Sequence, residues 1–216
     1  LNYLGATNSL PLVAGTTDIY SYQQTDLIAS GNTWQPRPVF QSYSVFNDAL
    51  AKKNQQHLMG ANRPDTIFFK LQPIDNRLPS LEEGGSWITL LEYYEPSFWA
   101  RDFLVLHKRD IKKRLQVSKT AQHVYKLGQT VHLPPTDSLI YVELAITPTF
   151  WGTINTFLFK PQELEIVIVL KDLRQRRYRM IAAMAKSGFF LSPFIARTED
   201  IPALYRVDPF ASKNIL

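Results

Sequence analysis

The residues best suited to chemistry lie in one polar segment, QPIDNRLPSLEEGG at positions 72–85. It follows a predicted buried strand, and α/β sheets bind ligands at the carboxyl ends of their parallel strands. Asp75 and Arg77 would form the polar floor of a cleft there, and Asp75 with Glu82 or Glu83 would supply the two carboxylates of glycoside chemistry. A structural interpretation instead has Asp75 capping a turn and pairing with Arg77, while the glutamates favour the start of a helix.

A second polar segment, RPVFQSYS at positions 37–44, begins with a predicted extended stretch at 37–40, where prolines flank Arg37. Arg37, Gln41 and Tyr43 carry groups that can hydrogen-bond a sugar or a carboxylate. The same side chains can instead fix the turn between the strand and the next helix. The two segments together predict a ligand-binding site.

Aromatic side chains gather near the end of the second long predicted helix, at Tyr94 and at the pair Phe98 and Trp99. Such an edge can stack on a pyranose ring, although aromatic residues at helix ends also serve packing. We therefore count Tyr94 among the candidate ligand-binding residues.

Several classes of chemistry are excluded by what the sequence lacks. There is no cysteine, and hence no disulfide scaffold, thiolate metal site or Cys nucleophile. The chain has no P-loop, dinucleotide fingerprint, zincin helix or nucleophile elbow. Its four histidines, at positions 57, 107, 123 and 132, are not spaced for a metal ion. We expect no metal, no cofactor and no catalytic residues, which favours a non-catalytic function while leaving an enzyme as an alternative.

The net charge of +5 is concentrated in two basic clusters, at positions 107–114 and 171–179. Concentrated positive charge can mark a nucleic-acid or anionic-lipid surface. Neither cluster has the interleaved aromatic residues of a single-strand binder. A solvated linker and a hairpin with outward arginines are therefore the favoured interpretation.

The first half alternates strand and helix patterns, which is typical of parallel βαβ units. We expect a small three-layer α/β domain with a mostly parallel sheet over residues 1–110. Within it, Ser44 and Ser86 would cap the two longer helices, and Pro96 would end the second. The predicted strands are 18–21, 66–71 and 102–107, and the predicted helices are 24–30, 44–58 and 87–95.

Helical patterns nearly vanish after a charged linker at 111–120. Short strands at regular spacing predict an antiparallel β-sandwich over residues 121–216. We expect this domain and the α/β domain to bury separate apolar interiors, giving a two-domain α+β protein. The predicted strands are 124–133, 139–147, 151–159, 164–170, 176–182 and 189–195, followed by a short helix at 198–205.

Several segments of the chain together resemble part of a known protein family. RPVFQSYS, the helix with Asn54 and His57, PDTIFFKLQPIDNRLPSLEEG, DFLVLHKR and RRYRMIAAMAKSGFFLSP together resemble the extracytoplasmic region of an uncharacterised family of polytopic bacterial membrane proteins. Some such proteins are similar to multi-spanning membrane glycosyltransferases, an analogy of fold alone. The resemblance implies a periplasmic or external location, with a membrane-embedded portion before Leu1. It transfers no catalytic residue.

The sequence thus predicts a non-catalytic soluble region of a membrane protein that binds or positions a glycan or a cell-envelope protein. One alternative is a glycoside-acting enzyme that uses Asp75 with Glu82 or Glu83. Another is a nucleic-acid or anionic-lipid binder that works through the two basic clusters.

Overall fold

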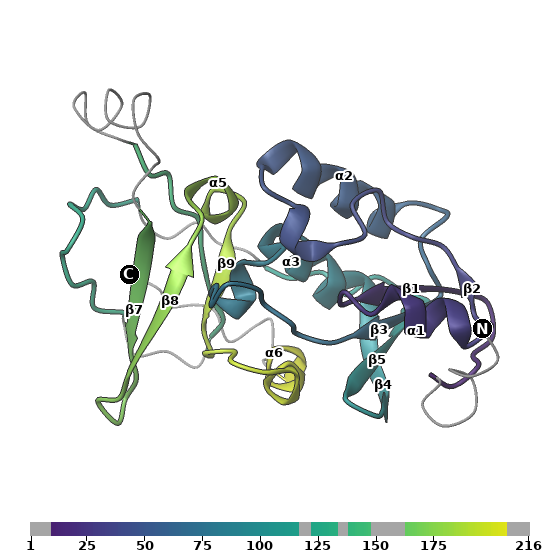
Figure 1. The fold of residues 1–216 in the computed structure, drawn as a ribbon. Coiled ribbons are helices and arrows are strands. Elements are labelled where there is room, and N and C mark those ends of the chain that lie inside the picture. Colours follow the sequence, from purple (N-terminus) through teal and green to yellow (C-terminus); the bar gives the residue numbers. More distant parts are fainter. Residues whose placement is uncertain (1–9, 117–121, 134–137, 148–162, 207–216) are drawn as a thin grey trace.

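A five-stranded mixed sheet forms the centre of the first half (Figure 1). The computed structural model describes residues 10–116, 122–133, 138–147 and 163–206. The strand order is β2-β1-β3-β5-β4, in which β1 pairs in parallel with β2 and β3, while β5 is antiparallel to β3 and β4. The strands are β1 (Thr16–Tyr20), β2 (Thr33–Trp34), β3 (Thr66–Phe69), β4 (Tyr94–Ala100) and β5 (Phe103–Lys108).

The mixed α/β class is confirmed, but the sheet is less parallel than expected, because half of its strand pairs are antiparallel. The cause is β4, a strand that was not predicted. Pro96, expected to end a helix, lies inside β4, where an edge strand tolerates a residue without a backbone N–H. A tight turn through Arg101, with φ of 58°, then returns the chain as β5 beside β3.

Helices cover both faces of this sheet. The helices are α1 (Gln24–Ala29), α2 (Asp48–Met59) and α3 (Gly84–Tyr93), with short 3-10 turns at η1 (Ser42–Ser44) and η2 (Pro79–Leu81). Leu27 of α1 packs with Ile19 and Phe68 on one face. The long helices α2 and α3 pack together on the other face, where they meet the alternate sheet residues (Figure 1).

Neither of the two long helices begins at the residue that the sequence predicted. Asn47, not Ser44, caps α2, and its side-chain oxygen accepts the N–H of Leu50 at 3.0 Å. Helix α3 begins at Gly84, with Glu83 as N-cap in the left-handed conformation, so Ser86 lies within the helix.

Two small antiparallel sheets make up the described part of the second half. β6 (Ile140–Val142) pairs with β9 (Phe189–Ser192), and β7 (Leu164–Val169) pairs with β8 (Gln175–Met180). The β7–β8 hairpin lies at the opposite end of the molecule from β1 and β2 (Figure 1). The remaining helices are α5 (Ala182–Ala185), η3 (Thr198–Asp200) and α6 (Pro202–Arg206).

The antiparallel strands predicted at 164–170, 176–182 and 189–195 are confirmed, as is a helical segment within 198–205. A β-sandwich is not confirmed, because the described strands form two separate pairs. The strand predicted at 124–133 is wrong: this stretch is irregular and exposed, so its apolar residues have no sheet face to cover. The strand predicted at 151–159 lies outside the described residues.

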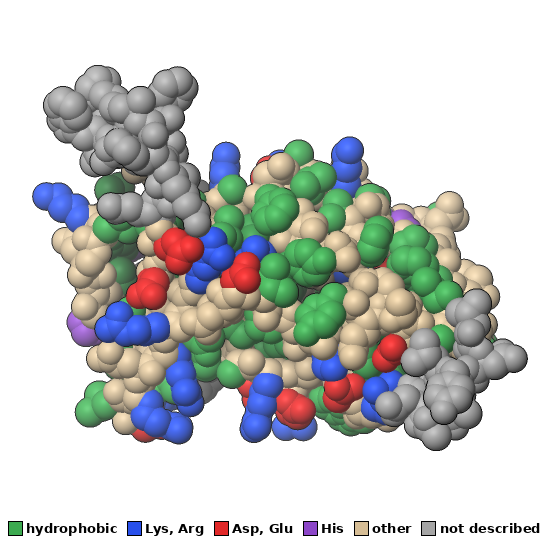
Figure 2. All heavy atoms as spheres, in the orientation of Figure 1, with side chains coloured by type: hydrophobic (Ala, Val, Ile, Leu, Met, Phe, Trp, Pro, Cys, Tyr) green, Lys and Arg blue, Asp and Glu red, His purple; other side chains and the backbone are tan. Residues whose placement is uncertain are grey.

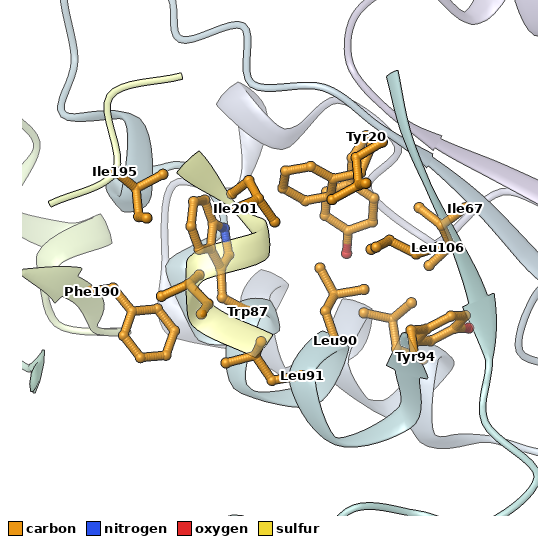
Figure 3. Close-up of a cluster of buried hydrophobic side chains, with 14 residues drawn as sticks. Tyr20, Ile67, Trp87, Leu90, Leu91, Tyr94, Leu106, Phe190, Ile195 and Ile201 are labelled. Atoms are coloured by element: carbon orange, nitrogen blue, oxygen red, sulfur yellow. The ribbon is translucent and has the colours of Figure 1, made fainter. Parts of the chain in front are cut away.

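The main core is shared between the two halves of the chain (Figure 3). Trp87 lies between the ring of Phe69 at 5.8 Å and that of Phe190 at 6.3 Å. Ile195, Ile201 and Leu204 join the same cluster. The expectation of separate interiors is therefore wrong for this cluster, whereas the boundary at residues 111–120 stays a prediction.

Candidate functional site

A buried ion-pair network joins strand β1 to the start of α3. The guanidinium of Arg37 lies 2.9 Å from Asp18 Oδ2 and 3.0 Å from Glu83 Oε2, and all three side chains are inaccessible to solvent. It also stacks on the ring of Tyr20, with Cζ 3.6 Å from the ring centroid. Arg37 Nη2 donates to Ser42 Oγ at 2.9 Å, which connects the network to η1.

The bonds of Glu83 leave it no spare capacity for chemistry. Its Oε1 accepts hydrogen bonds from Tyr20 Oη at 2.8 Å, Asn54 Nδ2 at 2.9 Å and Ser86 Oγ at 2.9 Å. Its Oε2 accepts the Nε–H of Arg37. A carboxylate that accepts this many hydrogen bonds is held immobile. Glu83 is thus a structural anchor rather than an acid or a base.

Burial and the neighbouring charges of the network shift the pKa values of Arg37 and Tyr20. Burial alone lowers the pKa of Arg37, but the charges of Glu83 and Asp18 outweigh burial and raise that pKa above its usual value. Burial, followed by the charge of Glu83, raises the pKa of Tyr20 well above its usual value. The network therefore keeps Arg37 charged and Tyr20 protonated.

A pocket opens above this network at the carboxyl ends of parallel strands β1 and β3, and we call it the β1/β3 pocket. Its volume is about 20 Å³, which is room for one or two water molecules. Both aromatic and polar side chains line it. Its lining residues are Tyr20, Ser21, Tyr22, Ser42, Tyr43, Phe69, Lys70, Leu71, Gln72, Glu82 and Trp87.

The six predicted ligand-binding residues are not brought together in this pocket. Tyr43 lines it, while half-buried Gln41 precedes η1. Arg37 belongs to the buried network beneath it. Tyr94 is buried in the main core, where its hydroxyl donates to the carbonyl of Pro64 at 3.0 Å, so Tyr94 cannot stack on a ligand.

Asp75 and the backbone that follows it contact the second half of the chain. Asp75 is exposed, and its carboxylate lies 3.3 Å from Arg179 of β8. The backbone beside Asp75 is joined to the same strand, since the N–H of Arg179 donates to the carbonyl of Asn76 at 2.8 Å. Buried Arg77 donates from Nη1 to the carbonyl of Tyr43 at 2.9 Å. The structural interpretation of these residues thus accounts for the contacts that they make.

The carboxylates proposed for glycoside chemistry do not face one another across a cleft. Arg77 lies between two of them, 3.7 Å from Asp75 Oδ2 and 3.8 Å from Glu82 Oε1. Of the three carboxylates, only that of Glu82 lines the β1/β3 pocket. The carboxylate of Glu83 is hydrogen-bonded within the buried network. A glycosidase needs both carboxyl groups directed at the scissile bond. This arrangement does not provide that pair.

Glu82 is the acidic side chain among the residues that line the pocket. Burial, with smaller contributions from Asp75 and Glu83, raises the pKa of Glu82 from 4.5 to about 7, against the opposing hydrogen bond from the N–H of Ile74 and the charge of Arg77. The Ile74 nitrogen lies 3.1 Å from Oε1. Glu82 therefore changes its charge near neutral pH.

The protein should lose stability as pH rises from about 4.5 to about 7. Because the pKa of Glu82 is higher in the folded chain, ionising it costs folding free energy, roughly 3 kcal/mol in full at about 1.4 kcal/mol per pKa unit. Urea unfolding at about pH 5 and about pH 8 measures this loss. Glu82→Gln should remove most of it, and an equal pH dependence in the variant would contradict the assignment.

Tyr20, Tyr22 and Gln72 are among the pocket residues that sequence reasoning did not single out. Tyr20 ends β1 and Tyr22 follows it, so their position after a strand end was a usable signal. Gln72 directly follows the predicted strand 66–71, and its Oε1 is buried without a hydrogen-bond partner among the described residues.

The basic clusters are extensively paired with carboxylates. On the face drawn in Figure 2, Lys and Arg side chains are interspersed with Asp and Glu. Such pairing weakens the attraction of a polyanion. The ion pairs are Lys108–Asp65, Arg109–Glu95 and Lys112–Glu92 in the first cluster, and Arg174–Asp172, Arg177–Glu165 and Arg179–Glu163 in the second.

Comparisons with known proteins find no relative: no family model, curated protein or solved structure matches the chain. Among the described residues, no three His, Asp or Glu side chains are grouped to hold a metal ion. Within the same ranges, no helix has the length and apolarity to cross a bilayer. Function must therefore be argued from the pocket itself.

Proposed function

We propose that this chain is a non-catalytic binding region that holds a glycan at the β1/β3 pocket. The observation that supports it is a water-sized hole, lined by tyrosines and by a few polar side chains, at the carboxyl ends of two parallel strands. A hole that admits one or two waters also admits a sugar hydroxyl, which makes the same kinds of hydrogen bond.

The surroundings of the hole suit a sugar ring. Tyr22 is half exposed and Tyr43 is half-buried, so both present aromatic surface at the rim. Aromatic rings pack against the C–H face of a pyranose while their polar ends remain available for hydrogen bonds. Ser42, Gln72 and Glu82 supply the polar groups that would orient the hydroxyls.

The buried network beneath the pocket favours binding over catalysis. Arg37 ties the end of β1 to η1 and to the start of α3, so the pocket wall is preorganised before a ligand arrives. Glu83 is fully occupied by hydrogen bonds, and Arg77 lies between Asp75 and Glu82, which argues against the glycoside-acting enzyme. The paired basic clusters argue against nucleic acid or anionic lipid as the partner.

We further propose that this binding takes place outside the cytoplasm, in the soluble region of a bacterial membrane protein anchored by a portion outside this chain. The resemblance of the segments 37–44, 64–84 and 176–193 to that region of the membrane-protein family supports this setting. A glycan of the cell envelope is the ligand that such a location offers. A cell-envelope protein remains the second candidate, favoured by the exposed rings of Tyr22 and Phe46.

Tyr22→Ala should weaken glycan binding at least about tenfold, because the variant loses the exposed stacking surface of the rim. The measurement is binding to a panel of peptidoglycan fragments and lipopolysaccharide core oligosaccharides. Tyr125→Ala is the matched control, since Tyr22 and Tyr125 are both 51% exposed and Tyr125 lies outside the pocket. Failure of the unmodified protein to bind any member, or equal weakening in both variants, would refute the proposal.

A further inference from the structure

A second depression lies between edge strand β4 and the η3–α6 segment, and we call it the β4/α6 groove. Its volume is about 390 Å³, within the range of sites for small molecules. Strand β4 and helix α6 contact one another. The groove therefore has room for a whole sugar ring, which the β1/β3 pocket lacks.

An exposed indole forms one wall of this groove. Trp99 is 45% exposed and lies opposite Leu104 of β5, on the face of the sheet that carries the main core. Among the described residues that line the groove, it is the only large hydrophobic side chain with high exposure. A broad aromatic plane at the edge of a depression is a stacking surface for a ring with an apolar face.

The opposite wall offers both hydrogen-bond donors and acceptors. Glu199 of η3 contributes a carboxylate and Arg206 of α6 a guanidinium, both on the rim of the groove. Among the described residues, Glu199 forms a weak, exposed ion pair with Arg197 at 3.8 Å. A sugar hydroxyl is both donor and acceptor, so it satisfies either group.

This wall is preorganised. Asp200 Oδ2 accepts the N–H groups of Ala196 at 3.0 Å and Arg197 at 3.1 Å, which fixes the turn into η3. Ile201 and Leu204 anchor the segment in the main core. A wall that is already ordered loses little entropy when a ligand binds.

We propose that the β4/α6 groove is a saccharide-binding site separate from the β1/β3 pocket, in which Trp99 stacks on a sugar ring while Glu199 and Arg206 bind its hydroxyl groups. The single exposed indole argues against a protein partner, because a stable protein interface buries about 800 Å² on each side. The inference does not depend on the proposed function of the first pocket.

The test is fluorine NMR of the protein labelled with 5-fluorotryptophan, titrated with N-acetylglucosamine, galactose, mannose and their dimers. The Trp99 resonance is assigned by its loss in Trp99→Phe. At least one sugar should shift it saturably and leave the resonance of buried Trp87 unchanged. If none of these sugars shifts the Trp99 resonance, the proposal is overturned.

Two variants test whether the sugar binds in the β4/α6 groove itself. Phe98→Ala is the matched control, because Phe98 is 42% exposed but lies opposite Val105, on the other face of the sheet. Isothermal titration calorimetry should show that Trp99→Ala weakens binding of the sugar that shifts the Trp99 resonance at least about tenfold. Phe98→Ala should leave this affinity unchanged. Equal weakening in both overturns the proposal. Tyr22→Ala should leave the Trp99 response intact, and its loss would show one site rather than two.

Discussion

Replacing Arg37 by methionine should lower the free energy of unfolding by about 3 to 5 kcal/mol. The substitution removes the cation placed between Asp18 and Glu83, both of which are inaccessible to solvent. Two carboxylates would then remain buried without that countercharge, and Ser42 would lose its link to the network. Urea unfolding at neutral pH measures the effect.

Two further variants show whether the loss of stability depends on the guanidinium of Arg37 and on its burial. Arg37→Lys should restore little, because an ammonium group cannot bond to both carboxylates and to Ser42 with the planar geometry of a guanidinium. Arg174→Ala removes an arginine whose pair with Asp172 is exposed to solvent, and it should leave the stability essentially unchanged. A loss below about 1 kcal/mol for Arg37→Met would contradict the role given to the network.

Trp87→Ala should cost about 3 to 5 kcal/mol, the range for deleting a buried aromatic side chain. Trp87 is 3% exposed, and its Nε1 donates to the carbonyl of Glu82 at 3.2 Å. Its ring touches Phe69 of β3 and Phe190 of β9, so the cavity would open in the part of the core that joins the two halves of the chain.

Hydrogen exchange of the Trp87→Ala variant shows whether both halves of the chain lose stability. Amide protection should fall together at Val105 in β5 and at Phe190 in β9, because both strands pack into one connected interior. Trp99→Ala is the control for the residue type: Trp99 is exposed, so its loss should cost no more than about 1 kcal/mol. Loss of protection confined to one half would mean that the halves fold independently.

Elements with a strong local pattern were predictable. The buried run from Thr66 to Phe69 and the helix from Gln24 to Ala29 appear within two residues of their predicted bounds. The hairpin of β7 and β8 was also found, because alternation of side chains along a strand is a local property. Strand β4 was missed because YEPSFWA contains a proline and has no regular alternation of buried residues.

The location of the pocket was better predicted than its residues. Polar segments after strand ends pointed to the carboxyl edge of the sheet, where the β1/β3 pocket lies. Arg37 and Tyr94 were expected to face a ligand, yet both side chains are buried. Sequence alone could not distinguish these outcomes, because the partners of Arg37 lie 19 and 46 positions away along the chain.

The sequence by itself determined the local elements, the absence of thiol chemistry and the positions where the chain turns at strand ends. The tertiary structure decided which charges are neutralised, which aromatic rings reach the surface and that one core spans both halves. These properties depend on burial and on contacts between distant residues, and a side chain's pKa, partners and exposure follow from its neighbours in space. That is why Glu83 serves as an anchor, whereas the adjacent Glu82 titrates near neutral pH.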